Sequence, residues 1–181
     1  IISLQIIIIA KFIPVIISIP FSNQSIETFD IPISWQVPSI ILITLIFRGQ
    51  VVTIAFSIYL LIGLLFLPVF QDGGSIGYLL TPNFGYLLGT YPLIKIIDKL
   101  NKLNHKIYQY DLFKYGVLAI TSMHIIGITY SFIQILFIKQ PNILLYNISK
   151  YSLGKFAYHL LMLTPITFLI KLINIIHRYN K

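Results

Sequence analysis

Long apolar runs separated by short polar segments dominate the chain and predict membrane-spanning helices. About 20 mostly apolar residues cross the hydrocarbon core of a bilayer as an α-helix. Six runs approach that length, and none alternates with the period of two that marks a membrane β-strand. We therefore predict an all-α integral membrane protein with six transmembrane helices, in which residues 1–181 form a single transmembrane domain. The predicted spans are residues 1–20, 31–47, 51–70, 78–97, 115–138 and 153–176.

The segments between these spans are polar, glycine-rich or lysine-rich and predict loops and turns. They are residues 21–30, 48–50, 71–77, 98–114 and 139–152.

The predicted fourth span differs from the others because Pro82, Gly85, Gly89 and Pro92 interrupt it. Proline and glycine weaken a helix, so this pattern predicts a broken one. Irregular backbone is tolerated within a membrane where it packs in protein or lines a cavity, and several transporters bind substrates at broken helices. A ligand site is therefore one interpretation of this segment, and tight helix packing through small residues is the other.

Composition supports a lipid environment. Only 10% of the residues are charged, against about 25% in soluble domains, and the mean hydropathy is +0.87. The absence of cysteine excludes a disulfide scaffold. The net charge of +8 would indicate nucleic acid in a soluble domain. Here the cations lie between apolar runs, so they indicate membrane orientation, and we expect no nucleic-acid partner.

The distribution of Lys and Arg predicts the orientation. With six spans, both termini share a side with the predicted loops at residues 48–50 and 98–114. Eight cations lie on or beside this side and three on the other, which favours N-in, C-in because cytoplasmic loops are enriched in Lys and Arg. The eight are Arg48, Lys95, Lys99, Lys102, Lys106, Lys114, Arg178 and Lys181, and the three are Lys139, Lys150 and Lys155.

The chain lacks the residue patterns of common catalytic sites. There is no phosphate loop of the type GxxxxGK[ST], so we expect no ATPase activity of its own. The four histidines are widely separated and there is no HExxH motif, so we expect no metal site. Too few acids are present to support paired-carboxylate or Ser-His-Asp chemistry. We therefore predict a protein that is not an enzyme and has no cofactor.

The glycine-rich segment closely resembles the core motif of the BioY family. The residues that carry the resemblance are Leu67-Pro68-Val69-Phe70, Gly73-Gly74, Gly77, Leu79-Leu80, Pro82 and Gly85-Tyr86-Leu87-Leu88-Gly89. The segments Ser34-Trp35-Gln36-Val37-Pro38 and Tyr151-Ser152-Leu153-Gly154 are similar to the cyanobacterial branch of that family.

The resemblance implies a biotin-specific S-component of an energy-coupling-factor (ECF) transporter, with the S-component bundle of six helices. Such a subunit captures biotin from the outer side of the membrane. A transmembrane T-component and cytoplasmic ATPase subunits then drive its release inward. The implied location is a bacterial plasma membrane or the membrane of an organelle such as a plastid.

Biotin carries a ureido ring, an apolar sulfur ring and a carboxylate, so its site should offer amides, aromatic walls and a cation. Candidate ligands of biotin on this basis are Gln36, Asp72, Gly73, Gly74, Tyr78, Asn83, Gly85, Tyr86, Thr167 and Lys171. Several have alternative interpretations. Asn83 is also a candidate helix cap, the tyrosines fit an aromatic belt, and Lys171 can extend to the inner headgroups.

The last span departs from the family pattern and leaves the ligand open. Many members carry an Asp followed three residues later by a Lys, whereas the run from Thr164 to Lys171 has no carboxylate. A different vitamin is therefore an alternative ligand, and a structural subunit or intramembrane enzyme is a remote alternative. Lys155, His159, Thr167 and Lys171 share one helix face at four-residue steps, with Leu163 between His159 and Thr167, and we expect this polar stripe to face the bundle. For His124 we favour hydrogen-bonded packing over a functional role.

Overall fold

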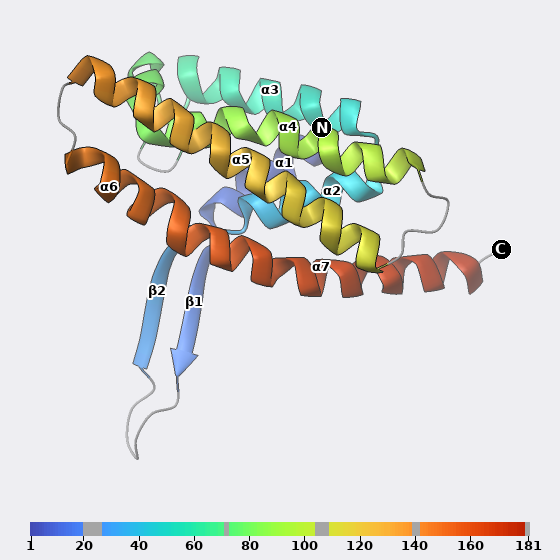
Figure 1. Cartoon of the computed structure of the whole chain (residues 1–181). Helices are drawn as coiled ribbons and strands as arrows, with labels where there is room; N and C mark the ends of the chain where they lie inside the picture. The colour runs from blue at the N-terminus through green and yellow to red at the C-terminus, as the bar shows by residue number, and fades with distance from the viewer. Residues whose placement is uncertain (20–26, 71–72, 104–108, 139–141, 180–181) are drawn as a thin grey trace.

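The computed structural model describes residues 1–19, 27–70, 73–103, 109–138 and 142–179, and it is largely helical (Figure 1). The elements in chain order are α1 (Ile2–Phe12), β1 (Pro14–Ile19), β2 (Glu27–Ser34), α2 (Gln36–Ile46), α3 (Gly49–Leu65), the 3₁₀ turn η1 (Ile76–Leu80), α4 (Pro82–Leu103), α5 (Gln109–Ile138), α6 (Asn142–Ile148), the π-helical turn η2 (Ser149–Leu153) and α7 (Gly154–Tyr179).

The predicted number of six helices is confirmed within these described ranges. Helix α6, the turn η2 and helix α7 form one continuous helix, because Ile148 and Gly154 both keep right-handed helical backbone angles. Together with α1 to α5 this makes six helices over the described residues.

The lengths of these helices differ from the predicted spans. Two segments of the described chain, Tyr110–Leu136 and Leu145–Leu172, are long and apolar enough to cross a membrane. Helices α1 and α2 have 11 residues each and α3 has 17. At about 1.5 Å per residue, 11 residues reach roughly 16 Å, about half of the hydrocarbon core. The predicted spans at residues 1–20, 31–47 and 51–70 are therefore shorter as helices than the sequence pattern indicated.

A β-hairpin replaces part of the first two predicted spans. Strands β1 and β2 pair antiparallel, with Val15 opposite Ile31 and Ile19 opposite Glu27, and they project from the helical bundle (Figure 1). Helix α1 ends before Pro14, where Ile13 is already extended, because a residue before proline avoids helical angles. The β-branched residues that follow favour a strand. An apolar run alone does not distinguish these two outcomes.

The break in the fourth predicted span lies earlier than expected. Helix α4 continues through Gly85, Gly89 and Pro92, and the irregular backbone occupies the segment before Pro82. The predicted loops at residues 98–114 and 139–152 also contain helix, since α4 extends to Leu103, α5 begins at Gln109 and α6 begins at Asn142. The polar residues of these two segments therefore belong partly to the ends of helices and not only to loops.

Glycines bring α4 close to α5. A Cβ atom at Gly85 would overlap the ring of Tyr130, and one at Gly89 would meet the backbone oxygen of Met123 at 2.5 Å. The hydroxyl of Tyr130 donates a hydrogen bond to the backbone oxygen of Leu79. The packing interpretation of Gly85 and Gly89 is therefore the one that the structure supports, and this helix pair forms the rigid side of the bundle.

A substitution at this contact tests the packing directly. We expect Gly89→Ala to destabilise the protein by about 1–3 kcal/mol, because the new methyl group forces backbone apart in a packed interior. Gly154→Ala is the matched control, since a Cβ there meets no atom within 4 Å and alanine favours the helix. Thermal unfolding in detergent measures both variants. Equal melting temperatures for the two would contradict this account of the α4–α5 contact.

Candidate functional site

A polar cavity lies between the helices at the end of the bundle where α4 begins. Its volume is modest, with about 80 Å³ of space for water, which is enough for several water molecules. Its lining comes from α1, β2, α2, α3, the segment before α4, and from α4, α5, η2 and α7. The lining residues are Lys11, Ile33, Ser34, Gln36, Val37, Ile40, Tyr59, Phe70, Tyr78, Asn83, Tyr86, Leu87, Thr90, Met123, His124, Tyr151, Lys155 and His159.

Two buried amides face this cavity from the beginnings of neighbouring helices. Gln36 is the first residue of α2 and Asn83 the second residue of α4, and each is 7% exposed. The Nε2 group of Gln36 is buried and forms no hydrogen bond of normal geometry within the described residues, although its side chain lies beside the Tyr59 hydroxyl. A buried amide donor without a partner is costly, so a bound ligand is the natural acceptor.

A row of aromatic rings forms one wall. The ring of Phe70 lies 5.4 Å from that of Tyr59 and 4.5 Å from that of Tyr78, between centroids. The backbone around Gly73 and Gly74 allows the chain to place Phe70 there. Gly73 has a φ of +119°, and a Cβ atom at Gly74 would meet the backbone oxygen of Gly63 at 2.6 Å. These glycines therefore support the aromatic wall through their backbone without contributing side chains to it.

The opposite wall is a continuous chain of hydrogen bonds across three helices. The hydroxyl of Tyr86 lies 2.7 Å from Oγ of Ser152, which lies 3.2 Å from Nδ1 of His124. The Nε2 atom of His124 then lies 3.3 Å from Nδ1 of His159. This last contact needs one donor and one acceptor, so the two imidazoles are not both cationic. The chain links α4, α5 and α7 through polar groups that would otherwise be buried without partners.

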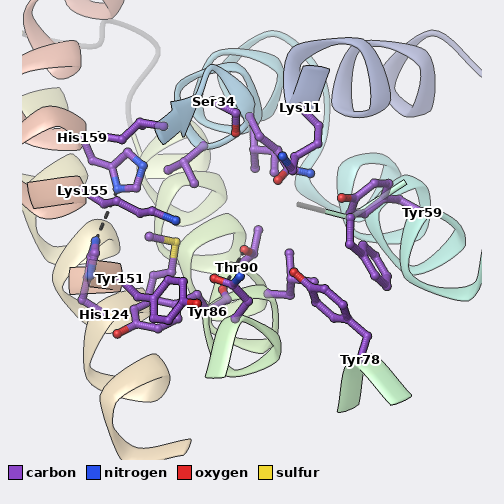
Figure 2. A pocket seen from close by; sticks show the side chains of 18 residues that line it. Lys11, Ser34, Tyr59, Tyr78, Tyr86, Thr90, His124, Tyr151, Lys155 and His159 are labelled. Atoms are coloured by element: carbon purple, nitrogen blue, oxygen red, sulfur yellow. Dashed lines mark hydrogen bonds between the residues drawn. The ribbon is translucent and has the colours of Figure 1, made fainter. Parts of the chain in front are cut away.

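Two lysines contribute positive charge to the cavity from different walls. Lys155 extends from α7 toward the middle of the cavity, and Lys11 lies across from it near Ser34 (Figure 2). The ammonium group of Lys155 also lies 5.1 Å from the ring centroid of Tyr151. Among the described residues no Asp or Glu lines the cavity. Its net charge therefore favours an anionic ligand.

Four of the residues predicted from the sequence line this cavity, namely Gln36, Tyr78, Asn83 and Tyr86. Gly73, Gly74 and Gly85 do not line it and instead support the packing behind it. Asp72 lies outside the described residues. Thr167 and Lys171 are also absent from the lining, and Lys171 is exposed.

The position of Lys171 follows from helix geometry. Each four-residue step in an α-helix advances by about 400°, so a stripe at such steps drifts by roughly 40° per step. Lys155 and His159 line the cavity, whereas Lys171, three steps beyond His159, has rotated away. The predicted polar stripe therefore faces the cavity only at its beginning.

The predicted site did not include eight polar residues that line the cavity. They are Lys11, Ser34, Tyr59, Thr90, His124, Tyr151, Lys155 and His159. The stripe that included Lys155 and His159 was a usable signal. No sequence signal separated a packing role for His124 from a cavity position, because both place a polar group inside an apolar span.

The sequence model of the BioY family matches residues 2–171, which is nearly the whole chain. The chain belongs to the BioY family. Membership of this family identifies the chain as an integral membrane protein, and its long apolar helices agree with that. None of the curated proteins gives a significant match.

A solved structure shares the fold of this BioY-family chain. It is the crystal structure at 2.1 Å of the S-component for biotin from an ECF-type ABC transporter. The TM-score is 0.61 at 20% sequence identity, and the match covers 94% of this chain and 87% of the other. The six-helix S-component fold is therefore confirmed.

The hydrogen-bond chain of this BioY-family protein predicts energetic coupling between its members. We expect Tyr86→Phe and Ser152→Ala to be non-additive, with a coupling free energy of about 0.5–3 kcal/mol, because the hydroxyls bond each other. Unfolding of the two single variants and the double variant measures this. Thr129→Val combined with Ser152→Ala is the control pair and should be additive, since Thr129 is exposed and its hydroxyl bonds the backbone of its own helix. Additive effects of Tyr86→Phe and Ser152→Ala would contradict the coupling.

Proposed function

We propose that this chain is the biotin-binding S-component of an ECF importer and that biotin binds in the cavity described above. The observation that carries the proposal is a cavity lined by two buried amides, by tyrosine rings and by two lysines, in a chain of the BioY family. These three features match the ureido ring, the apolar sulfur ring and the carboxylate of biotin.

The amides of Gln36 and Asn83 are assigned to the ureido ring. Each amide offers a donor and an acceptor, as the ureido group requires. The Nε2 group of Gln36 lies near the Tyr59 hydroxyl but forms no hydrogen bond of normal geometry among the described residues, and it would donate to the ureido oxygen. Tyr59, whose hydroxyl lies beside the Gln36 side chain, and Tyr78 line the same cavity and supply a wall for the fused rings.

Lys155 is assigned to the biotin carboxylate, with Lys11 as a second cation. This assignment replaces Lys171, which lies outside the cavity lining. Lys155 enters the cavity beside Tyr86 and Tyr151 (Figure 2), so the valerate chain would extend along these rings. We retain Thr167, Gly73, Gly74 and Gly85 as supporting rather than contacting residues, and Asp72 as a candidate contact.

The cellular arrangement is also part of the proposal. We infer an N-in, C-in orientation from the Lys and Arg distribution, so that residues 1–181 act as one transmembrane domain whose cavity opens outward. A T-component and cytoplasmic ATPases are the expected partners, since the chain has no phosphate loop of its own. The resemblance to the cyanobacterial branch favours a bacterial plasma membrane or a plastid membrane.

Another carboxylate-bearing vitamin is the second candidate ligand. The departure of the last helix from the family pattern favours it, because the run from Thr164 to Lys171 has no carboxylate where many members carry an acid. Competition between biotin and a panel of vitamins in detergent decides between the two.

The role of Lys155 predicts a ligand-dependent effect. Isothermal titration should show one biotin bound per chain, and Lys155→Gln should weaken binding about tenfold to a hundredfold, as for a lost charged hydrogen bond. Biotinamide, which has no carboxylate, should bind wild type and Lys155→Gln nearly equally. Lys171→Gln serves as the control on the same helix and should leave affinity unchanged. Failure of the folded wild type to bind biotin would refute the function, and equal losses in both variants would refute the assignment.

The unpaired amide predicts opposite effects on stability and binding. Gln36→Met removes a buried donor that has no partner in the described protein, so we expect an unchanged or higher melting temperature without ligand. The same variant should bind biotin at least tenfold more weakly. A lower melting temperature together with full biotin affinity would show that Gln36 serves structure instead.

A further inference from the structure

A second polar hollow lies where the α2–α3 turn meets the second half of α4. It is lined by Arg48, Gln50, Asp98 and Lys102 and has about 340 Å³ of space for water. It shares no lining residue with the cavity proposed for biotin. Two cationic side chains and an amide in one hollow are the groups that bind phosphate oxygens in proteins.

Asp98 organises this hollow without neutralising it. Its Oδ1 atom accepts a hydrogen bond of 2.8 Å from the backbone N–H of Gly49, and its Oδ2 atom lies 2.5 Å from Nζ of Lys102. A Cβ atom at Gly49 would overlap the Asp98 side chain, so the turn and α4 are in close contact. This contact brings Arg48, the N-cap residue of α3, into the same hollow as Lys102.

The surroundings add further positive charge. Lys95, Lys99 and Lys102 recur at steps of four and three residues, which places them along one face of α4, and all three are exposed. With Arg48 they make four cations around the single carboxylate of Asp98. The local field therefore attracts anions to the hollow.

An exposed apolar stripe on α3 begins directly beside the hollow. Its members recur at steps of three and four residues from the position after Gln50, so they lie on one face of the helix. They are Val51 (48% exposed), Ile54 (61%), Ile58 (40%), Leu61 (55%) and Leu65 (56%). A cationic hollow at the end of such a stripe has the layout of a phospholipid, with a charged head and an apolar tail.

We propose that this hollow is a binding site for an anionic phospholipid, with its phosphate between Arg48 and Lys102 and an acyl chain along the α3 stripe. Basic pockets between membrane helices bind anionic headgroups in this way. The predicted orientation places the hollow at the inner surface of the membrane. Charge complementarity selects the lipid class, and the site is independent of biotin binding.

Native mass spectrometry of the purified chain, titrated with phosphatidylglycerol in detergent, tests the site. We expect Arg48→Gln to weaken binding about fivefold, and Arg48→Gln combined with Lys102→Gln about 25-fold, at roughly one such factor per cation. Lys150→Gln is the charge-matched control at the opposite end of the molecule, where Lys150 is exposed, and it should bind like wild type. Melting temperatures of the apo variants verify that each is folded.

Three ligands make the test specific. Phosphatidylcholine should bind at least fivefold more weakly than phosphatidylglycerol. The affinity of a short-chain phosphatidylglycerol should lie between that of the long-chain lipid and that of sn-glycerol 3-phosphate. Equal loss of binding in Lys150→Gln and Arg48→Gln would overturn the site. Equal binding of phosphatidylcholine would overturn the charge selection. Displacement of the lipid by sn-glycerol 3-phosphate at equal concentration would overturn the role of the α3 stripe.

Discussion

Polar groups that are buried among apolar helices must find partners, and this requirement organises the structure. In an interior where water is scarce, an unpaired donor or acceptor costs more than a packed apolar group. The bonds from Tyr86 through Ser152 and His124 to His159 meet this requirement while joining α4, α5 and α7. The amide of Gln36 has a donor left over within the described protein. Gln134 and Tyr158 also have a buried polar atom without a hydrogen-bond partner among the described residues. Of the three residues only Gln36 lines the cavity, so a ligand bound there would complete its hydrogen bonding.

Close packing complements this polar network. The glycines of α4 allow it to lie directly against α5, and the chain before α4 folds back so that Phe70 packs between Tyr59 and Tyr78. One side of the cavity is thus set by backbone contacts and the other by hydrogen bonds. A ligand would meet preformed walls on both sides, which lowers the ordering cost of binding.

The sequence predicted the helical class, the six helices and the family, because apolar run length and the glycine-rich motif are local signals. It did not predict the hairpin of β1 and β2, since an isoleucine-rich run fits either a helix or a strand until proline and pairing partners decide. Gln36 and Asn83, which line the cavity, were predicted because an amide matches the donors and acceptor of a ureido ring. For the carboxylate the sequence indicated Lys171, but Lys155 lines the cavity and Lys171 does not, because a stripe at four-residue steps drifts around the helix. Lys11 and Tyr59 gave no signal, since only the tertiary arrangement brings α1 and α3 to the cavity.

The π-helical turn at residues 149–153 has a consequence for how such cavities diversify. It contains one residue more than an α-helical path would need. Within it Tyr151 lines the cavity, and Ser152 bonds Tyr86 and His124. Deleting a single residue there would restore regular helix, and because the wide turn absorbs the extra residue, the helical segments on either side would keep their faces. One codon lost would thus change what this turn presents to the cavity, while the apolar faces on either side keep their own periodicity. A membrane receptor built in this way can vary one turn of its cavity and leave the packing of its helices in place.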